Sequence, residues 1–134
     1  MIIRMFKKVN YVFMLAVLLA NPVNANVYPV SLIELLAVPE KFNGKEISVI
    51  GYLNGTITFD LYLSRDHANI LDRESSIEII DNTPDGSLIQ SSCASNYVQV
   101  KGTFKKRADS MYVIAYIKSV SIMESLKTCW KSSE

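Results

Sequence analysis

Residues 65–74 hold the densest collection of titratable side chains in the chain: Arg65, Asp66, His67, Asp72, Arg73 and Glu74. Carboxylates that hold a metal ion, together with arginines that contact phosphate, are the groups that a metal-assisted phosphodiesterase or nuclease requires. The spacing matches no such motif, and the chain has one histidine, no G-x-S-x-G and no H-E-x-x-H sequence. We therefore predict a solvated loop here, with no catalytic residue, metal site or cofactor, and keep the metal-assisted enzyme as the alternative.

A second group of residues favours binding over catalysis. Strand alternation predicts that one outward face carries Tyr52, Thr58, Asp60, Tyr62 and Glu78. Tyrosine rings stack on sugars or bases, whereas the carboxylates beside them repel phosphate. The face therefore favours a glycan or a peptide over nucleic acid, although cross-strand pairs on an ordinary solvated sheet face explain the same residues.

Basic side chains gather at the end of another predicted strand, at Lys101, Lys105, Lys106 and Arg107. Lys41 and Lys45 join them if the first turn of the fold packs against that edge. A charged hairpin tip of this kind keeps an exposed strand edge from pairing with another chain. Contact with an anion or with lipopolysaccharide is the alternative role of these residues.

The only two cysteines, Cys93 and Cys129, are predicted to form a disulfide. Closing a loop of about 37 residues stabilises a fold by roughly 3–4 kcal/mol in the chain-entropy model. The spacing is not a redox C-x-x-C motif, and two cysteines with the single His67 fall one short of four zinc ligands. A free thiol or an intermolecular bridge is the alternative, and Trp130 is expected to pack over the disulfide rather than anchor a partner.

The composition describes one globular domain. The chain has 134 residues, of which 49% are hydrophobic and 20% charged, with 14 basic against 13 acidic side chains. Wholesale disorder requires low hydrophobicity and high net charge, so this composition excludes it.

Residues 1–25 have the three parts of an export signal. A basic start with Arg4, Lys7 and Lys8 precedes an apolar run over Tyr11–Ala20, which is shorter than the roughly 20 residues of a membrane span. Val23-Asn24-Ala25 then suits a signal peptidase, so we predict cleavage after Ala25. A retained N-terminal anchor is the alternative.

Cleavage leaves a single domain over residues 26–134. It removes three basic and no acidic residues, so 11 basic and 13 acidic side chains remain and the net charge is −2. The mature protein is then expected to be periplasmic or secreted, without a stable membrane span. Its summed charge supplies no long-range attraction to nucleic acid.

Local signals predict a short helix and two strands after the leader. Ser31 and Glu34 form a capping box that starts the helix, and Pro39 ends it. Residues 46–54 are predicted as a strand, with Gly51 marking a bulge or bend. Asn54-Gly55 is predicted as a type I′ turn that leads into a second strand over residues 56–64.

The rest of the chain is predicted to add three strands. Residues 65–75 hold a short helical turn, 76–81 the third strand, 82–96 a long loop with Cys93, and 97–105 the fourth strand. The apolar alternation of the fifth strand, 110–123, slips near Ile117 and predicts a bend or bulge there. Five strands with one short helix predict a mainly β fold, a small β-barrel.

The sequence resembles a group of small, largely uncharacterised exported bacterial proteins. The resemblance rests on Val30–Leu53 with its P-E-K-F-N-G-K run and V-x-G strand, on Leu61–Ser64, on Tyr97–Phe104 with V-x-G-T-F, and on Ile117–Met123. It implies a five-stranded OB-fold-like barrel with a short N-terminal helix, and no established reaction or catalytic residues. The long loop 82–96 and the Cys129-Trp130 tail depart from the pattern.

Together these features predict a non-enzymatic binding or adaptor module that recognises an envelope or secreted protein, or a glycan. OB-folds bind ligands on the face of their second and third strands and on the flanking loops. The candidate surfaces are therefore the tyrosine-bearing face and the disulfide-tied loop 82–96. A metal-assisted phosphodiesterase and an anion- or oligonucleotide-binding module are the alternatives.

Overall fold

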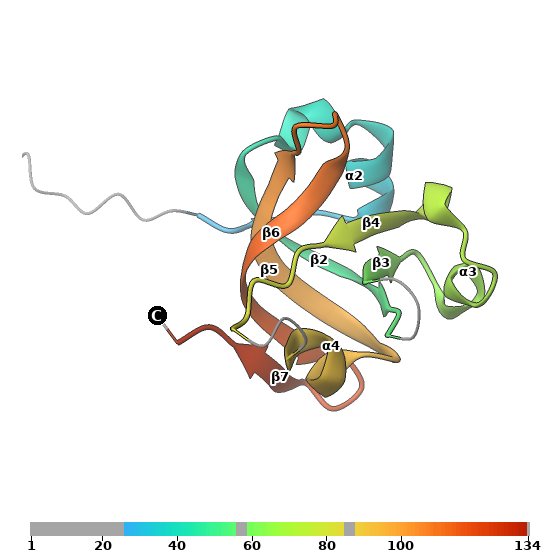
Figure 1. The fold of residues 1–134 in the computed structure, drawn as a ribbon, viewed down its shortest axis with the longest axis vertical. Helices are drawn as coiled ribbons and strands as arrows, with labels where there is room; N and C mark the ends of the chain where they lie inside the picture. Colours follow the sequence, from blue (N-terminus) through green and yellow to red (C-terminus); the bar gives the residue numbers. More distant parts are fainter. Residues whose placement is uncertain (1–25, 56–58, 85–87, 134) are drawn as a thin grey trace, which may run out of the picture.

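The computed structural model describes residues 26–55, 59–84 and 88–133. The predicted leader, residues 1–25, and Thr58 of the predicted binding face lie outside the described residues. Figure 1 shows a small barrel of strands, with helix α2 at one end, helix α4 at the other and helix α3 at one side.

The described chain enters the barrel through a two-residue strand, β1 (Tyr28–Pro29), and helix α2 (Leu32–Ala37). The hydroxyl of Ser31 caps this helix as predicted, because it accepts a hydrogen bond from the backbone N–H of Glu34 at 3.1 Å. The helix ends before Pro39, which begins the 3-10 turn η1 (Pro39–Phe42). Buried side chains from these two segments cover one end of the barrel: Leu32, Leu35 and Phe42.

Strand β2 (Lys45–Leu53) has the predicted alternation, and its next partner, β3 (Asp60–Tyr62), is shorter than predicted. The predicted two-residue turn at Asn54-Gly55 is wrong, because Leu53 pairs with Leu61 across a longer connection. Both leucines are fully buried, so the core sets this register and overrides the local turn preference.

The expected bulge at Gly51 is a close approach between strands instead. Gly51 keeps regular pairing with Val98 of the neighbouring strand. A Cβ atom at Gly51 would lie 2.7 Å from Cγ of Leu61 and 2.8 Å from the carbonyl oxygen of Tyr62. Only glycine lets β3 pack this tightly against β2.

The predicted helical turn and third strand are confirmed as helix α3 (Arg65–Asn69), the 3-10 turn η2 (Arg73–Ser75) and strand β4 (Ser76–Ile79). The predicted loop 82–96 contains a further helix, α4 (Leu88–Cys93), which the sequence analysis missed. Asp81 fixes its start, since its carboxylate accepts from the backbone N–H of Thr83 at 3.0 Å and of Ile89 at 3.1 Å. Ile89 and Cys93, four residues apart, are buried against the barrel.

Strands β5 (Asn96–Lys106) and β6 (Tyr112–Ile122) form a long antiparallel pair joined by residues 107–111. The predicted irregularity of β6 is confirmed, because the pairing shifts between Lys101 and Thr103 of β5. Opposite this shift, Tyr116 adopts a φ of 49°.

A last strand, β7 (Lys127–Lys131), pairs with β6 and was not predicted. It brings Cys129 to Cys93, and the predicted disulfide joins them, with their Cα atoms 5.6 Å apart. Trp130 is partly buried and packs against the core. The disulfide thereby ties α4 to the C-terminal strand.

The barrel closes in the order β2-β3-β4-β6-β5 and back to β2. Neighbouring strands are antiparallel except β4 and β6, which are parallel. Strand β1 adds to β2 in parallel, outside the closed barrel. This mainly β architecture is the predicted OB-fold-like barrel.

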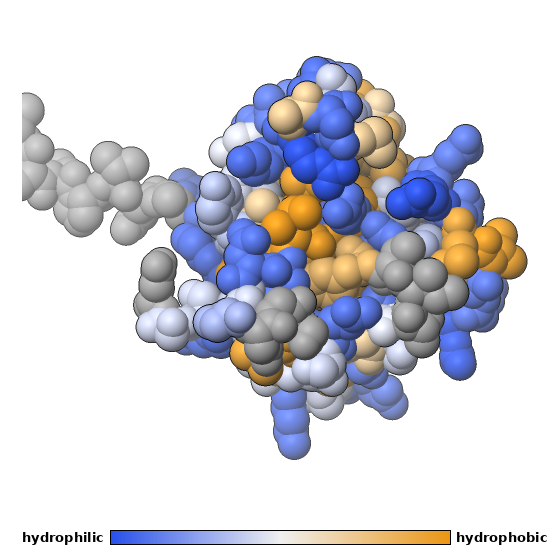
Figure 2. Space-filling view, in the orientation of Figure 1, coloured by the Kyte–Doolittle hydropathy of each residue, from blue (hydrophilic) through white to orange (hydrophobic). Residues whose placement is uncertain are grey.

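The interior of the barrel is one apolar cluster to which every barrel strand, both end helices and the disulfide contribute. Figure 2 shows hydrophilic side chains over much of one face, with hydrophobic side chains gathered near its middle and at the side where α3 lies. Within the described ranges, no helix is long and apolar enough to cross a membrane.

Candidate functional site

A cleft of about 360 Å³ lies on the face where OB-folds bind ligands, outside β3 and β4 and beside the loop that joins β5 to β6. We call it the Asp60 cleft. Its lining residues are Asp60, Arg73, Ser76, Glu78, Arg107, Met111 and Tyr112. They come from two barrel strands, the turn before β4 and the residues around the β5–β6 loop, so only the folded barrel assembles them.

Asp60 is buried, with 5% of its surface exposed, although strand alternation predicted that it faces solvent. Its Oδ2 atom is buried and has no hydrogen-bond partner among the described residues. An unpaired buried carboxylate oxygen is costly, since folding removes its hydration and nothing replaces it. Such an atom in a native fold needs a physical explanation.

Glu78 lies directly opposite Asp60 across the β3–β4 pair. Like charges in opposite positions of an antiparallel pair repel each other. Arg107 compensates Glu78, because its Nη1 donates to Oε2 of Glu78 at 2.8 Å. Asp60 has no such partner.

Arg107 is held from a second side by Asp109. Its Nε and Nη2 atoms donate to the two carboxylate oxygens of Asp109 at 3.1 and 2.8 Å. The hydrogen bonds from Arg107, and next the bond from the backbone N–H of Met111, lower the pKa of Asp109 below its ordinary value. The hydrogen bonds to Asp109 and Glu78 raise the pKa of Arg107, so its charge is fixed and already shared by two carboxylates.

The described residues of the predicted tyrosine face do not lie on one surface. Asp60 and Glu78 line the Asp60 cleft. Tyr52 lines a second hollow of about 360 Å³, the tyrosine groove, together with Arg65, Ser95, Asn96, Tyr97, Ile122 and Glu124. Tyr62, predicted to face outward, is fully buried. The prediction of an exposed Tyr62 is therefore wrong, and a buried ring offers no face to a ligand.

In the tyrosine groove the two tyrosines contact each other and the backbone. The rings of Tyr52 and Tyr97 pack edge to face, with centroids 5.2 Å apart. The hydroxyl of Tyr97 accepts from the backbone N–H of Arg65 at 3.1 Å. The groove thus presents an aromatic surface whose ring pair and hydroxyl already have partners within the chain.

The predicted basic cluster is divided as well. Arg107 belongs to the Asp60 cleft, whereas Nζ of Lys105 lies 5.3 Å from the ring centroid of Tyr116. Lys101 is exposed on β5, and the backbone N–H of Lys106 donates to Oδ1 of Asn43 at 3.0 Å.

The expectation that Lys41 and Lys45 lie near this end of β5 is confirmed, since Lys45 pairs with Phe104. The two ammonium groups lie 5.5 and 5.8 Å from the ring centroid of Phe42. These lysines therefore pack over an aromatic ring rather than around one shared anion position.

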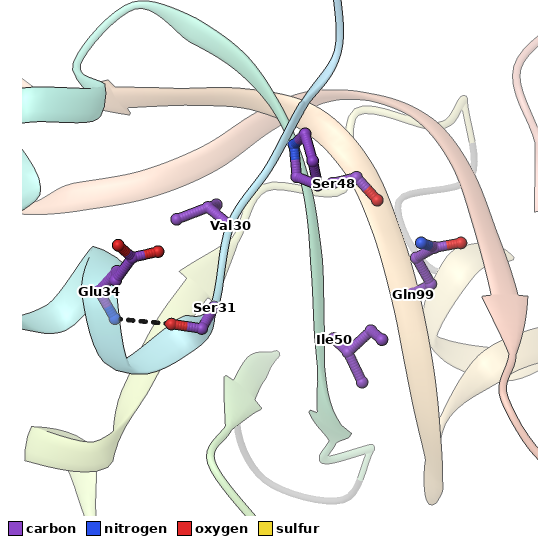
Figure 3. Close-up of a pocket in the computed structure, with 7 residues that line it drawn as sticks. Val30, Ser31, Glu34, Ser48, Ile50 and Gln99 are labelled. Carbon is purple, nitrogen blue, oxygen red and sulfur yellow. Dashed lines mark hydrogen bonds between the residues drawn. The ribbon is translucent and has the colours of Figure 1, made fainter.

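A third hollow, of about 380 Å³, lies between the β1–α2 segment and strands β2 and β5 (Figure 3). Val30, Ser48, Ile50 and Gln99 line it, and Ser31 and Glu34 are engaged there in the helix cap. Glu34 is its one charged lining residue. This hollow therefore holds fewer reactive or charged groups than the Asp60 cleft.

Two titratable residues of the predicted loop contact neighbouring serine hydroxyls. Nδ1 of His67 lies 2.7 Å from the hydroxyl of Ser64, the residue that caps α3. Asp72 accepts from the hydroxyl of Ser75 at 2.7 Å. Among residues 26–55, 59–84 and 88–133, no group of three His, Cys, Asp or Glu side chains is placed to hold a metal ion.

Sequence analysis found part of the Asp60 cleft and missed the rest. Asp60, Glu78 and Arg107 were candidates, but they were assigned to different surfaces. Ser76, Met111 and Tyr112 carried no signal, because each is an ordinary strand or loop residue until β4 and β6 become parallel neighbours. Arg73 was singled out only as part of a hydrolytic cluster.

Comparisons of the chain with protein-family models, with curated proteins and with solved structures found no match. The resemblance to small exported proteins thus rests on the sequence motifs alone. The functional argument consequently depends on the geometry of this chain.

Proposed function

We propose that the protein is a non-enzymatic binding or adaptor module that recognises a partner protein or a glycan through the Asp60 cleft. The observation that carries this proposal is the unpaired, buried carboxylate oxygen of Asp60 at the face where OB-folds bind ligands. Natural proteins leave few such atoms without a partner, and those that remain are concentrated at functional positions.

A binding role also suits the chemistry of the lining. Arg107 bridges Glu78 and Asp109 through three hydrogen bonds, an arrangement that can orient a ligand. Ser76 donates its hydroxyl to the backbone carbonyl of Arg73 at 3.1 Å, so it is not prepared as a nucleophile.

The proposal places the protein outside the cytoplasm, in the periplasm or secreted. The Cys93–Cys129 disulfide supports this placement, because disulfides persist in oxidising compartments and are rare where thiols are kept reduced. The export signal predicted over residues 1–25 supplies the route.

The test expresses the full 134-residue chain, determines the N-terminus of the purified product by mass spectrometry, and immobilises the protein with its disulfide intact. The bait is exposed to an envelope and secreted-protein extract and, separately, to a glycan array. A Ser76→Trp variant fills the cleft whatever the chemistry of the ligand. The matched control, Lys127→Trp, places the same ring on the exposed strand β7.

We expect a ligand that wild type and Lys127→Trp retain at moderate salt and that Ser76→Trp loses. Circular dichroism and urea unfolding establish that both variants are folded. Equal retention by all three proteins would move the site elsewhere, and a bait that retains neither protein nor glycan would contradict a binding module.

A further inference from the structure

We infer that the Asp60 cleft takes a cationic group, the ammonium of a lysine or the guanidinium of an arginine side chain on a partner protein. The inference rests on the proposed function and narrows it to one ligand chemistry. It starts from the balance of charges in the cleft rather than from its shape.

Three carboxylates lie in or beside the cleft, and Arg107 is already bound to two of them. Asp60 and Glu78 face each other across β3 and β4, and Asp109 lies on the other side of Arg107. Arg107 binds Glu78 and Asp109 through three of its nitrogen atoms. It therefore compensates those two groups, and among the described residues the carboxylate of Asp60 has no ion-pair partner.

Arg73 is the second cationic side chain that lines the cleft, and it does not pair with Asp60. Its side chain is exposed, and within the described ranges it forms no ion pair at 4.0 Å or less. Met111 is also exposed at the rim, with 61% of its surface accessible. Since Oδ2 of Asp60 is covered in the free protein, we expect these two flexible side chains to move aside when a ligand enters.

A cation satisfies the cleft more completely than the alternatives do. A sugar hydroxyl donates one hydrogen bond to Asp60 but brings no positive charge to pair with its carboxylate. A phosphate adds a further negative charge beside both carboxylates. An ammonium or guanidinium supplies the missing donor and the missing charge together.

The less polar part of the cleft lining, Tyr112 and Met111, suits the methylene stem of a lysine or arginine side chain. The ring of Tyr112 is stacked on the buried Phe104, with centroids 5.2 Å apart, so it is held in place. Aromatic faces attract cations, and methylene stems of lysine and arginine pack on apolar surfaces. Met111 adds an apolar, adaptable contact at the rim.

The test is a two-dimensional amide NMR titration of the purified, disulfide-intact protein. The probes are N-acetyl-lysine methylamide, N-acetyl-arginine methylamide, the neutral N-acetyl-norleucine methylamide, maltotriose and inorganic phosphate. We expect both basic probes to shift the backbone amides of Ser76, Glu78 and Met111, with a Kd on the order of 1 mM, typical of a single side-chain contact. The norleucine probe, which keeps the stem and loses the charge, should bind about tenfold more weakly or worse.

Three variants test which side chains are responsible for binding the lysine probe. Asp60→Asn should weaken the lysine probe about tenfold or more, while the urea midpoint rises because a buried charge is gone. Glu74→Gln removes the same charge from an exposed residue outside the lining and should stay within about twofold of wild type. Arg73→Ala should bind the lysine probe as tightly as wild type or more tightly, since a competing cation leaves the rim.

Each other outcome overturns a different claim. If maltotriose or phosphate shifts the cleft amides and the basic probes do not, the cation inference fails and the binding module stands. If Arg73→Ala weakens binding or Asp60→Asn leaves it unchanged, Asp60 is not the recognition group. If no probe binds and Ser76→Trp retains every partner of wild type, the proposed function fails as well.

Discussion

The Asp60 cleft and the tyrosine groove have the same size, about 360 Å³, and both lie on the outside of the barrel strands. They differ in how far the chain satisfies its own groups. In the groove the rings of Tyr52 and Tyr97 pack together, and the hydroxyl of Tyr97 binds a backbone N–H. In the cleft an aspartate buries an oxygen that has no hydrogen-bond partner in the described part of the chain.

We therefore rank one unsatisfied buried atom above exposed aromatic rings as an indication of a binding site. Tyrosine side chains on a sheet face stabilise the fold through cross-strand packing whether or not a ligand exists. A buried unpaired carboxylate opposes folding, so its retention needs another explanation. Three further predictions test this contrast, in order of the expected size of the effect.

The largest effect should separate the buried tyrosine from the exposed ones. Tyr62→Ala removes a fully buried ring and should lower the free energy of unfolding by about 3–5 kcal/mol. Tyr97→Ala removes a ring that is 44% exposed and should cost about 1 kcal/mol, the size of an aromatic pair. Urea unfolding at neutral pH measures both, and equal losses would mean that Tyr62 is not part of the core.

Removing the disulfide should disturb the tyrosine groove more than the Asp60 cleft. A Cys93→Ala, Cys129→Ala double variant opens a link between residues 36 apart in sequence and should lose about 3–4 kcal/mol of stability. Ser95 and Asn96 of the tyrosine groove follow Cys93 by two and three residues, whereas no lining residue of the Asp60 cleft lies that close in sequence to either cysteine. Amide NMR should therefore show shifts at Ser95 and Asn96 with Ser76 and Glu78 nearly unchanged, and the reverse pattern would contradict this division.

Lowering the pH should have the smallest of the three effects on stability. Hydrogen bonds from Arg107 and from the backbone of Met111 lower the pKa of Asp109 in the folded state. Its stabilisation is therefore fully present above the ordinary aspartate pKa of about 4 and is lost as the pH falls through the lower folded value. Asp109→Asn should flatten the dependence of the urea midpoint on pH in that range, and an unchanged slope would show that the Arg107 pair contributes nothing there.

Much of the fold could be predicted because its signals are local. The cap at Ser31, the end of α2 before Pro39 and the alternation of β2 and β5 depend on residues within one element. The slip in β6 was also visible in its own alternation and is the observed irregularity beside Tyr116. Short elements that need a partner were missed, namely α4 and β7, because six and five residues carry too little periodicity.

The candidate site could be predicted only in fragments. Asp60 and Glu78 were expected on one face, and β3 and β4 pair them as expected. The prediction that this face is exposed to solvent was wrong for Asp60 and Tyr62. Both side chains point outward from the barrel, but other segments cover them. Alternation says which side of a strand a residue occupies, and it does not say whether another segment lies over that side.

By itself the sequence determined most of the barrel strands, the short N-terminal helix, the disulfide partners and the polar residues available for recognition. Local backbone preferences and the pairing of the only two cysteines are properties of short segments and of composition. Tertiary structure alone decided that Leu53 pairs with Leu61, that Arg107 turns toward Glu78, and that Asp60 is buried without a partner. These outcomes depend on how a closed barrel places distant strands side by side, because hydrophobic burial in the core outweighs the local turn preference and the hydration of one carboxylate.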